Sequence, residues 1–250
     1  MIIKHIALPM VNNIYYFHLF LVLCIYVLQS LRVLKMNLKS YQKFLAVGIC
    51  SILLFTVYFY RDPERTPPLN ERGICISPAD GTVLYIKEYD GFPEVYKDGN
   101  KYVLKDIENY YRNGSYVIGI FMSPFDVHVN RAPIGGEVVY VKHFDGGYYP
   151  AFGSGVEGKN ERNVIIIKNG TDYVGVVQIA GMVARRTVSN VNEGDYVTIG
   201  QRIGIIKLGS QAAVILPKDK YEVLVKKDDK VYAGETIIAK LKNKTLQINN

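Results

Sequence analysis

Four short segments of this chain combine side chains that could carry out chemistry with residues that favour turns. They are S-P-A-D-G at 77–81, S-P-F-D-V-H-V-N-R at 123–131, N-E-R-N at 160–163 and K-L-G-S at 207–210. Taken singly, each has an ordinary explanation, because Asp-Gly is a common turn and Gly-Ser occurs three times in the chain. Taken together, one Asp, one His and a Ser that follows a flexible Gly supply an acid, a base and a nucleophile, the parts of a Ser–His–Asp relay.

Composition argues against several other kinds of site. The 250 residues are 49% hydrophobic and 21% charged, which is too apolar for a disordered chain. Three cysteines without a C-x-x-C pair make neither a disulfide framework nor a typical zinc site. None of the four histidines has H-E-x-x-H spacing, so we expect no metal cofactor.

The positive charge of the chain is concentrated at its hydrophobic end. Residues 1–60 contain five Lys or Arg and no Asp or Glu, which leaves 25 basic against 23 acidic residues in 61–250. A net charge of +7 would otherwise suggest a nucleic-acid partner. Because the body is nearly neutral, we expect no nucleic acid to bind it.

Two nearly uncharged apolar runs occupy residues 14–31 and 44–60. The second has 17 residues, at the short edge of what crosses a bilayer core of about 30 Å. No small-x-small cleavage site separates the runs, which argues against a signal peptide. We therefore expect 1–60 to form membrane-associating hydrophobic helices, with two buried core helices as the alternative.

Two membrane topologies are compatible with the sequence, and they place the body on opposite sides of the membrane. The loop 32–43 carries four of the five positive charges, which favours this loop in the cytoplasm and the body outside. Short, tilted or re-entrant insertion of both runs would instead leave the body in the cytoplasm. We expect a protein of the cell membrane with its catalytic domain on the cytoplasmic side.

The body, residues 61–250, is expected to be one β-rich domain. The proline-rich sequence RDPERTPP at 61–68 ends any helix and should uncouple the membrane segment from the body mechanically. Beyond it, β-branched runs alternate with Gly, Asp and Asn turns: GTVLYI, SYVIGIFM, GEVVYV, NVIIIK, DYVGVVQIA, QRIGIIKL and AAVILP. Such short, regularly spaced strands predict an all-β sandwich or barrel. Its exposed strand edges favour a homodimer.

Two internal repeats narrow this fold class. The pattern P-x-x-G-x-V-x-Y-x-K occurs at 78–87 and 133–142, and D-x-V-x-x-G-x-x-I lies within 194–203 and 228–237. Such elements resemble the barrel-sandwich hybrid of biotinyl and lipoyl carrier domains, so we expect a mainly β, barrel-sandwich-hybrid-like domain after the N-terminal helices. A carrier is therefore one alternative function, although neither M-K-M nor D-K-A occurs. A non-catalytic, membrane-anchored β-domain is the other.

The motifs taken as a set resemble one enzyme family. They are FYRDPERTPP, SPADG, MSPFDVHVNRAP, NERN, QIAGMVARR, GDYVTIGQRIGIIKLGS and ILP. In this order and spacing they resemble the phosphatidylserine decarboxylase proenzyme family over about residues 58–240. The likeness is closest to its short form, which includes the archaetidylserine decarboxylases of archaea.

The resemblance implies a self-processing enzyme. Ser210 Oγ would attack the Gly209 carbonyl, the peptide would become an ester, and elimination would split the chain into a β-chain, 1–209, and an α-chain, 210–250. The new first residue would become a pyruvoyl group, the cofactor that accepts electrons during decarboxylation. His128 would take the serine proton and Asp80 would orient it. The implied reaction converts phosphatidylserine or archaetidylserine to the ethanolamine lipid and CO2.

A serine phospholipid substrate calls for cations near the site. Arg185 and Arg186 are candidates for its phosphate, because guanidinium groups pair with phosphate in bidentate fashion, and Arg162 is a weaker one. The chain departs from the family in two places. The larger bacterial form has a second histidine where this chain has Arg131, so His143 is an alternative base. Gln211 stands where most members have Thr or Arg after the Gly-Ser pair.

Overall fold

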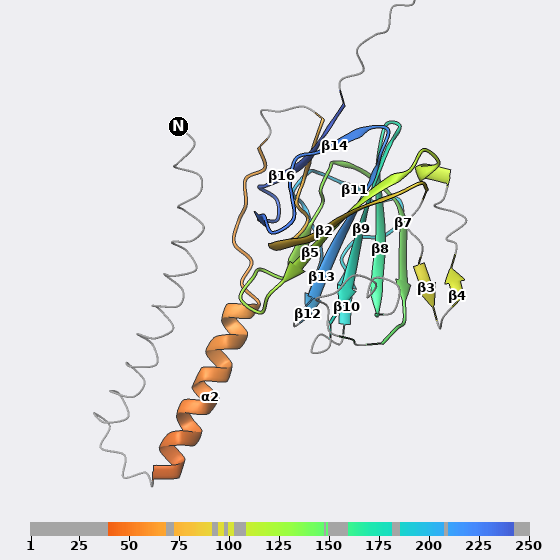
Figure 1. Ribbon diagram of the computed structural model, residues 1–250. Helices are drawn as coiled ribbons and strands as arrows, with labels where there is room; N and C mark the ends of the chain where they lie inside the picture. Colours follow the sequence, from red (N-terminus) through yellow and green to blue (C-terminus); the bar gives the residue numbers. More distant parts are fainter. Residues whose placement is uncertain are drawn as a thin grey trace, which may run out of the picture. The chain divides into compact units, whose positions relative to one another are not determined.

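The computed structural model describes residues 40–68, 73–91, 95–97, 100–102, 109–147, 149, 160–181, 186–207 and 210–242 (Figure 1). The chain divides into two compact units, residues 1–61 and 62–250. The first apolar run, 14–31, lies outside the described residues. The two units are described separately below.

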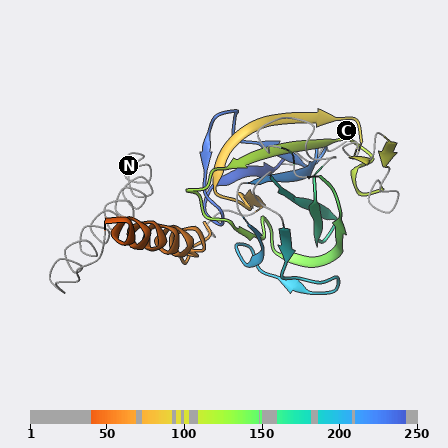
Figure 2. The same cartoon turned by 90° about the horizontal axis from the view of Figure 1, so that it is seen from below.

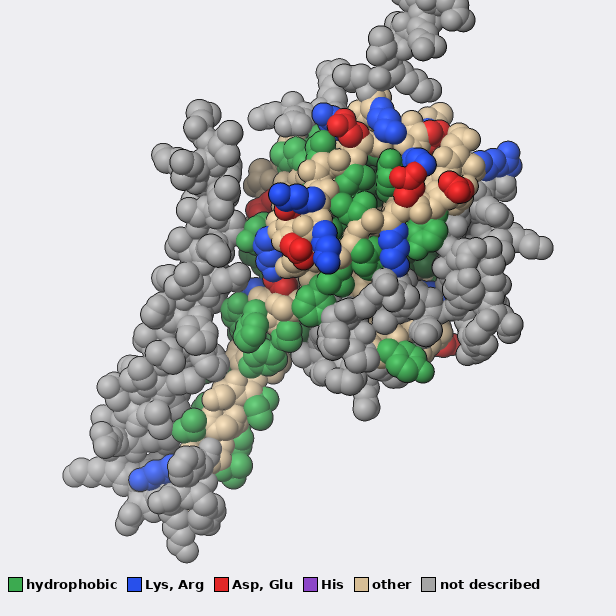
Figure 3. Space-filling model, in the orientation of Figure 1, with side chains coloured by type: hydrophobic (Ala, Val, Ile, Leu, Met, Phe, Trp, Pro, Cys, Tyr) green, Lys and Arg blue, Asp and Glu red, His purple; other side chains and the backbone are tan. Residues whose placement is uncertain are grey.

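The described part of the first unit is helix α2, Ser40–Phe59, which takes in nearly all of the second apolar run. Its turns expose large apolar side chains, and Figure 3 shows them along the helix: Leu45, Ile49, Ile52, Leu53 and Val57. After the helix, the Arg61 guanidinium bonds the carbonyl of Tyr58 at 2.9 Å and lies over its ring. Within the described residues, no helix combines the length and the hydrophobicity needed to span a membrane.

The second unit is built on an antiparallel sheet of eight strands, in the order β11-β7-β8-β9-β13-β5-β2-β15. The seven predicted strand runs are all strands, so this part of the expectation is confirmed. Two small three-stranded sheets, β1-β16-β14 and β10-β12-β6, and the pair β3-β4 complete the body. The elements are β1 Ile74–Ile76, β2 Gly81–Tyr89, β3 Val95–Lys97, β4 Asn100–Tyr102, η1 Asn109–Tyr111, β5 Ser115–Met122, β6 Val129–Arg131, β7 Gly136–Phe144, β8 Arg162–Asn169, β9 Asp172–Ala180, β10 Arg186–Ser189, β11 Tyr196–Val197, β12 Arg202–Lys207, β13 Ser210–Pro217, β14 Tyr221–Val223, β15 Lys230–Val231 and β16 Ile237–Leu241.

The central strands are buried on both faces, which explains their uninterrupted apolar sequences. Along β8, Ile165 and Ile167 pack into one apolar cluster, while Val164 and Ile166 pack into a second cluster on the opposite face. Seen from below, the sheet curls around its interior (Figure 2). On the face shown in Figure 3, Lys and Arg are interspersed with Asp and Glu over the body, as expected for a nearly neutral domain.

The two internal repeats occupy equivalent structural positions. Val83 donates its backbone N–H to Asp229 at 2.9 Å, and Val138, at the matching repeat position, donates to Asp195 at 2.8 Å. The strand pairings match as well, because β15 pairs with β2 in the same register as β11 pairs with β7. The duplication seen in the sequence is therefore a duplication of structure.

A glycine turn in each repeat fastens the segment that precedes its partner strand. Gly200 and Gly234 have φ angles of +80° and +78°, a conformation that residues with a Cβ rarely adopt. Their N–H groups bond the carbonyls of Ala132 and Ser77, each at 2.9 Å. The second turn therefore holds the S-P-A-D-G segment in place.

The proline-rich junction is bound to the body along residues 62–65. The Asp62 carboxylate accepts from Arg131 at 3.0 Å and also pairs with Arg202. Arg202 reaches Glu64 at 2.6 Å as well. Because the unit boundary falls between Arg61 and Asp62, these residues belong to the body.

A chain that begins at Arg61 should therefore fold on its own. It retains the arginine-bound junction and about 190 residues, enough for a full apolar core. We expect a β-type circular dichroism spectrum with one cooperative thermal transition. A random-coil spectrum from the truncated chain would instead assign the N-terminal apolar runs to the core.

Candidate active site

The sequence segments singled out for chemistry meet at one end of the large sheet. The backbone of Ser210, the first residue of β13, pairs with Met122 at the end of β5 and with Ala180 at the end of β9. Both neighbours are fully buried. Gly209 lies outside the described residues. The expected scissile bond therefore immediately precedes a strand that is hydrogen-bonded on both sides.

His128 lies in the connection between β5 and β6, and its side chain is buried. Its backbone carbonyl accepts from the N–H of Ile206 at 3.1 Å, four residues before Ser210. The connection itself begins after Met122, the strand partner of Ser210. Two backbone attachments therefore bring the histidine segment beside the start of β13.

The hydrogen bond of the His128 ring defines its basic nitrogen. Nδ1 lies 2.9 Å from the backbone carbonyl of Asp126. A carbonyl oxygen only accepts, so Nδ1 must carry the proton. In the neutral ring this leaves the lone pair on Nε2, which makes Nε2 the atom that takes up a proton.

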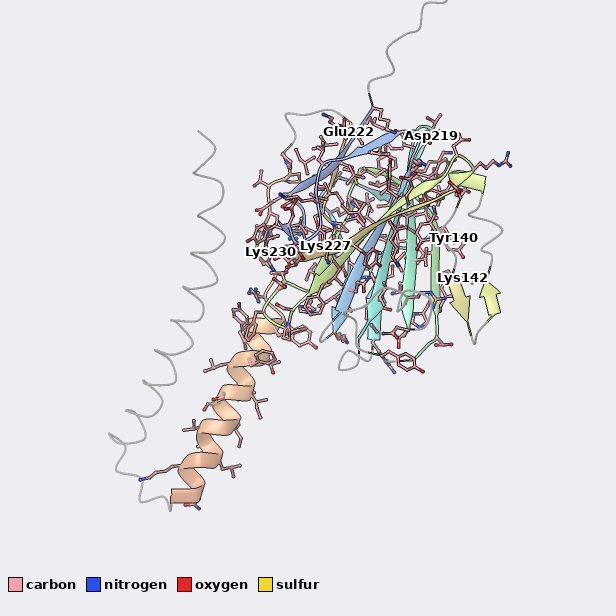
Figure 4. All side chains as sticks on the ribbon, in the orientation of Figure 1. Tyr140, Lys142, Asp219, Glu222, Lys227 and Lys230 are labelled. Atoms are coloured by element: carbon pink, nitrogen blue, oxygen red, sulfur yellow. The ribbon has the colours of Figure 1, made fainter. Side chains whose placement is uncertain are left out.

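Asp126 is fixed in turn by its own side chain, a feature that sequence reasoning missed. One carboxylate oxygen accepts from the N–H and the hydroxyl of Ser123, each at 2.8 Å. The other accepts from Lys230 Nζ at 2.7 Å. Lys230, labelled in Figure 4, belongs to β15 in the C-terminal repeat. The D-x-H spacing was the available signal for Asp126, whereas no local pattern pointed to Lys230.

Asp80 is buried, and both of its carboxylate oxygens are bound. One accepts from the backbone N–H of Ala233 at 2.8 Å and the other from the Arg65 guanidinium at 3.1 Å. Two residues earlier, the carbonyl of Pro78 accepts from the N–H of Arg131 in β6, at 2.9 Å. The Asp80 segment therefore lies against the strand that follows His128.

The contacts of the three candidates refine the expected relay. Asp80 and His128 lie in neighbouring segments, yet the Nδ1 hydrogen bond of the histidine goes to Asp126. Sequence reasoning missed the Asp126 carbonyl that bonds the ring, as well as Arg65, which holds Asp80. Arg65 is 15 residues from Asp80 in a proline-rich segment, where no motif marked it.

The alternative base, His143, lies elsewhere on the sheet. It is on β7, separated from β13 by β8 and β9, or about 14 Å along the sheet at ~4.8 Å per strand. Its ring is about half exposed, and Nδ1 lies 2.7 Å from Asn163 Oδ1. The structure thus brings His128, and not His143, to the segments around Ser210.

Arg131 occupies the position of the second histidine of the larger bacterial form and has a different task. Its guanidinium donates to the carbonyl of Gly200 at 3.0 Å, to Asp62 at 3.0 Å and to the carbonyl of Pro63 at 2.9 Å. It therefore fastens the junction to the body.

The candidate phosphate ligands differ in position. Arg185 lies outside the described residues, and Arg186 is exposed at the start of β10. Arg162 is buried over the Phe144 ring, and its Nη1 donates to Asn160 at 3.1 Å. Among the described residues its Nε and Nη2 have no hydrogen-bond partner. Burial lowers the pKa of Arg162 to about 10.

Strand register separates Arg162 from the row that contains residue 210. Arg162 pairs with Ile179, which pairs with Gln211, so these three residues form one cross-strand row. The next row, with Ala180, faces the opposite side, because successive residues of a strand alternate. Gln211 is buried and donates to the Tyr85 hydroxyl at 2.6 Å. Arg162 and Gln211 therefore belong to the far side of the sheet from Ala180.

The curled β-sheet thus has a central strand that begins at the candidate nucleophile, with the buried segment of the candidate base tied beside it. Within the described ranges, no group of three or more His, Cys, Asp or Glu is placed to hold a metal ion. Comparison with known proteins identifies the family: residues 52–239 match phosphatidylserine decarboxylase. The chain belongs to this family, and its enzyme class is that of a carboxy-lyase.

Individual relatives agree with this assignment. One from Methanocaldococcus jannaschii, named "Putative archaetidylserine decarboxylase proenzyme", is 62% identical over 201 residues, which cover 80% of this chain and 96% of that protein. A phosphatidylserine decarboxylase proenzyme from Carboxydothermus hydrogenoformans is 47% identical over 192 residues, 76% of this chain and 82% of the relative. The family assignment favours the enzyme over the carrier and the non-catalytic domain.

The positions of the two histidines predict different effects on chain cleavage. His128→Ala should slow self-cleavage by about 10²–10⁴-fold, the usual cost of losing a general base. His143→Ala, the matched control, should cleave at nearly the wild-type rate. Denaturing gels of a cleavage time course measure both. The reverse result would assign the base to His143.

The buried guanidinium of Arg162 predicts an unusual stability change. Arg162→Met keeps most of the side-chain volume and removes an uncompensated buried charge, so the free energy of unfolding should stay unchanged or rise by about 1–4 kcal/mol. Arg162→Ala, which leaves a cavity, should lower it. Urea unfolding measures both variants, and a large loss of stability in the Met variant would contradict this account.

Proposed function

We propose that the protein is a self-processing, pyruvoyl-dependent decarboxylase that converts phosphatidylserine or archaetidylserine to the corresponding ethanolamine lipid and CO2. The observation that carries the proposal is the start of β13 at Ser210, beside the buried segment of His128. Membership of the phosphatidylserine decarboxylase family supports the substrate class. The names of the relatives leave both tail chemistries open, since they include archaetidylserine and phosphatidylserine enzymes.

Processing would begin with attack by Ser210 Oγ on the carbonyl carbon of Gly209. His128 Nε2 would take the hydroxyl proton and return it to the amine of residue 210 as the C–N bond breaks, leaving an ester. Removal of the Ser210 α-proton would then break the Cβ–O bond and release Gly209 as a carboxylate. Tautomerisation and hydrolysis of the remaining enamine would expel ammonia and leave the pyruvoyl group.

The two chains produced by this cut would stay together through the sheet. The α-chain, 210–250, begins with β13, which pairs with β5 and β9 of the β-chain, 1–209. β15 and β16 of the α-chain also pair with β2 and β1 of the β-chain. Backbone hydrogen bonds on both sides of β13 would replace the lost covalent bond.

The surroundings of residue 210 suit a pyruvoyl group, which would supply the electron sink for the carbanion left by decarboxylation. Its neighbours Met122, Ala180 and Ala212 are fully buried, and two of them have small side chains. His128 Nε2 would hold or deliver a proton there. We assign the lipid phosphate to Arg185 and Arg186, because guanidinium groups bind phosphate in bidentate fashion.

We further propose that residues 1–60 attach the enzyme to the cell membrane and that 61–250 form the catalytic domain on the cytoplasmic side. The large apolar side chains exposed along α2 support the attachment. The equivalent hydrogen bonds of the two repeats support a barrel-sandwich-hybrid architecture for the domain. Exposed strand edges favour a homodimer.

Intact-mass analysis tests the proposed processing. Wild-type protein should split into a 209-residue and a 41-residue chain, and the short chain should be lighter than the same chain beginning with serine by the mass of one NH3. Ser210→Ala has no attacking hydroxyl and should stay a single chain. Wild-type protein that stays intact would contradict the proposal.

A further inference from the structure

Residues 62–65, called here the junction strap, form ion pairs with the body through both acidic and basic side chains. The acidic residue Asp62 pairs with Arg131 and Arg202 of the body. The basic residue Arg65 pairs with carboxylates of the body instead, because its guanidinium binds Asp80 at 3.1 Å and Glu235 at 2.7 Å. Arg65 is thus the strap residue that touches a proposed processing residue.

The Arg65–Asp80 pair is shielded from water. The side chains are 12% and 5% exposed, whereas Glu235 is 39% exposed. Burial by itself lowers the pKa of Arg65, but the nearby carboxylates of Asp80 and Glu235 raise it overall. Removing one partner of a buried ion pair leaves the other charge unpaired, which is costly. The buried carboxylate of Asp80 therefore depends on Arg65 for its opposite charge.

The other side of Asp80 is held by the C-terminal repeat. The N–H of Ala233 donates to its second oxygen, and Gly234 binds the carbonyl of Ser77. A Cβ at Gly234 would lie only 2.9 Å from Arg131 Cδ and 3.3 Å from Arg65 Cβ. The turn therefore packs directly against the strap.

The second copy of the repeat lacks this acidic pair. In the sequence alignment of the repeats, Gly135 takes the position of Asp80, and Gln201 takes that of Glu235. The matching backbone bonds are nevertheless present in both copies. The fold therefore does not require carboxylates at these positions, and the copy that carries them is the one that faces Arg65.

We propose that Arg65 is a positioning residue that holds Asp80 in place for self-cleavage, so that the junction strap is part of the processing site. The proposal rests on the proposed function. Arg65 acts through Asp80 and touches none of the reacting atoms. Loss of residues 62–65 would therefore disable processing even where the body still folds.

The test compares Arg65→Ala and Arg65→Lys with Arg202→Ala in the full chain. Arg202 is the matched control, because it ion-pairs with the strap at Asp62 and Glu64. Each proenzyme is made by cell-free translation with detergent, and the appearance of the short chain is followed on denaturing gels. Thermal unfolding of the same variants with Ser210→Ala added, which cannot split, reports their stability.

Arg65→Ala should slow splitting about tenfold or more, since a hydrogen bond to a charged group is lost. Arg65→Lys, which keeps the charge, should recover part of the rate, and Arg202→Ala should stay within about twofold of wild type. Cleavage of Arg65→Ala at the wild-type rate overturns the inference. Equal slowing of cleavage in Arg65→Ala and Arg202→Ala overturns it as well. If Arg65→Ala fails to fold, Arg65→Lys takes its place, and cleavage of this variant at the wild-type rate, or slowed only as much as in Arg202→Ala, overturns the inference. An intact wild type overturns the proposed function itself, and the inference with it.

Discussion

The pairing of β13 on both sides is the constraint on which the rest of this structure depends. A bond that is to be cut needs chains that remain together afterwards, and β13 has eight paired positions with β5 and six with β9. Its alternate residues enter both apolar clusters, for example Val214 on one face and Ile215 on the other. The proposed cleavage end at Ser210 is therefore held by a central strand of the sheet.

Three polar side chains buried near this end, those of His128, Asp126 and Asp80, each have specific hydrogen-bond partners. His128 is held by the Asp126 carbonyl, and the Asp126 carboxylate is held by Lys230. Asp80 has Arg65 and the N–H of Ala233. Burying such groups without partners would cost several kcal/mol each, roughly, so these partners are part of the site as much as the reactive side chains. Several of them come from the segment after residue 209, which ties the two expected chains together.

The internal duplication repeats one backbone arrangement with two different sets of side chains. Both copies use the same strand-turn-strand element and the same backbone bonds to clamp the segment before β2 or β7. Only the copy around β2 carries Asp80 and its acidic neighbour Glu235. Because the backbone bonds are the same in both copies, the fold does not depend on the carboxylates of Asp80 and Glu235.

The sequence by itself determined the strands, the repeats and the reactive residue types. Seven β-branched runs became strands because burial on both faces selects apolar residues without interruption, and this signal is local. The family motifs likewise marked Asp80, His128 and Ser210. The tertiary structure alone decided their partners: Lys230 lies 104 residues from Asp126, and Arg65 lies 170 residues from Glu235. Contacts between distant segments depend on how the curled sheet brings its ends together, and no local pattern records that geometry.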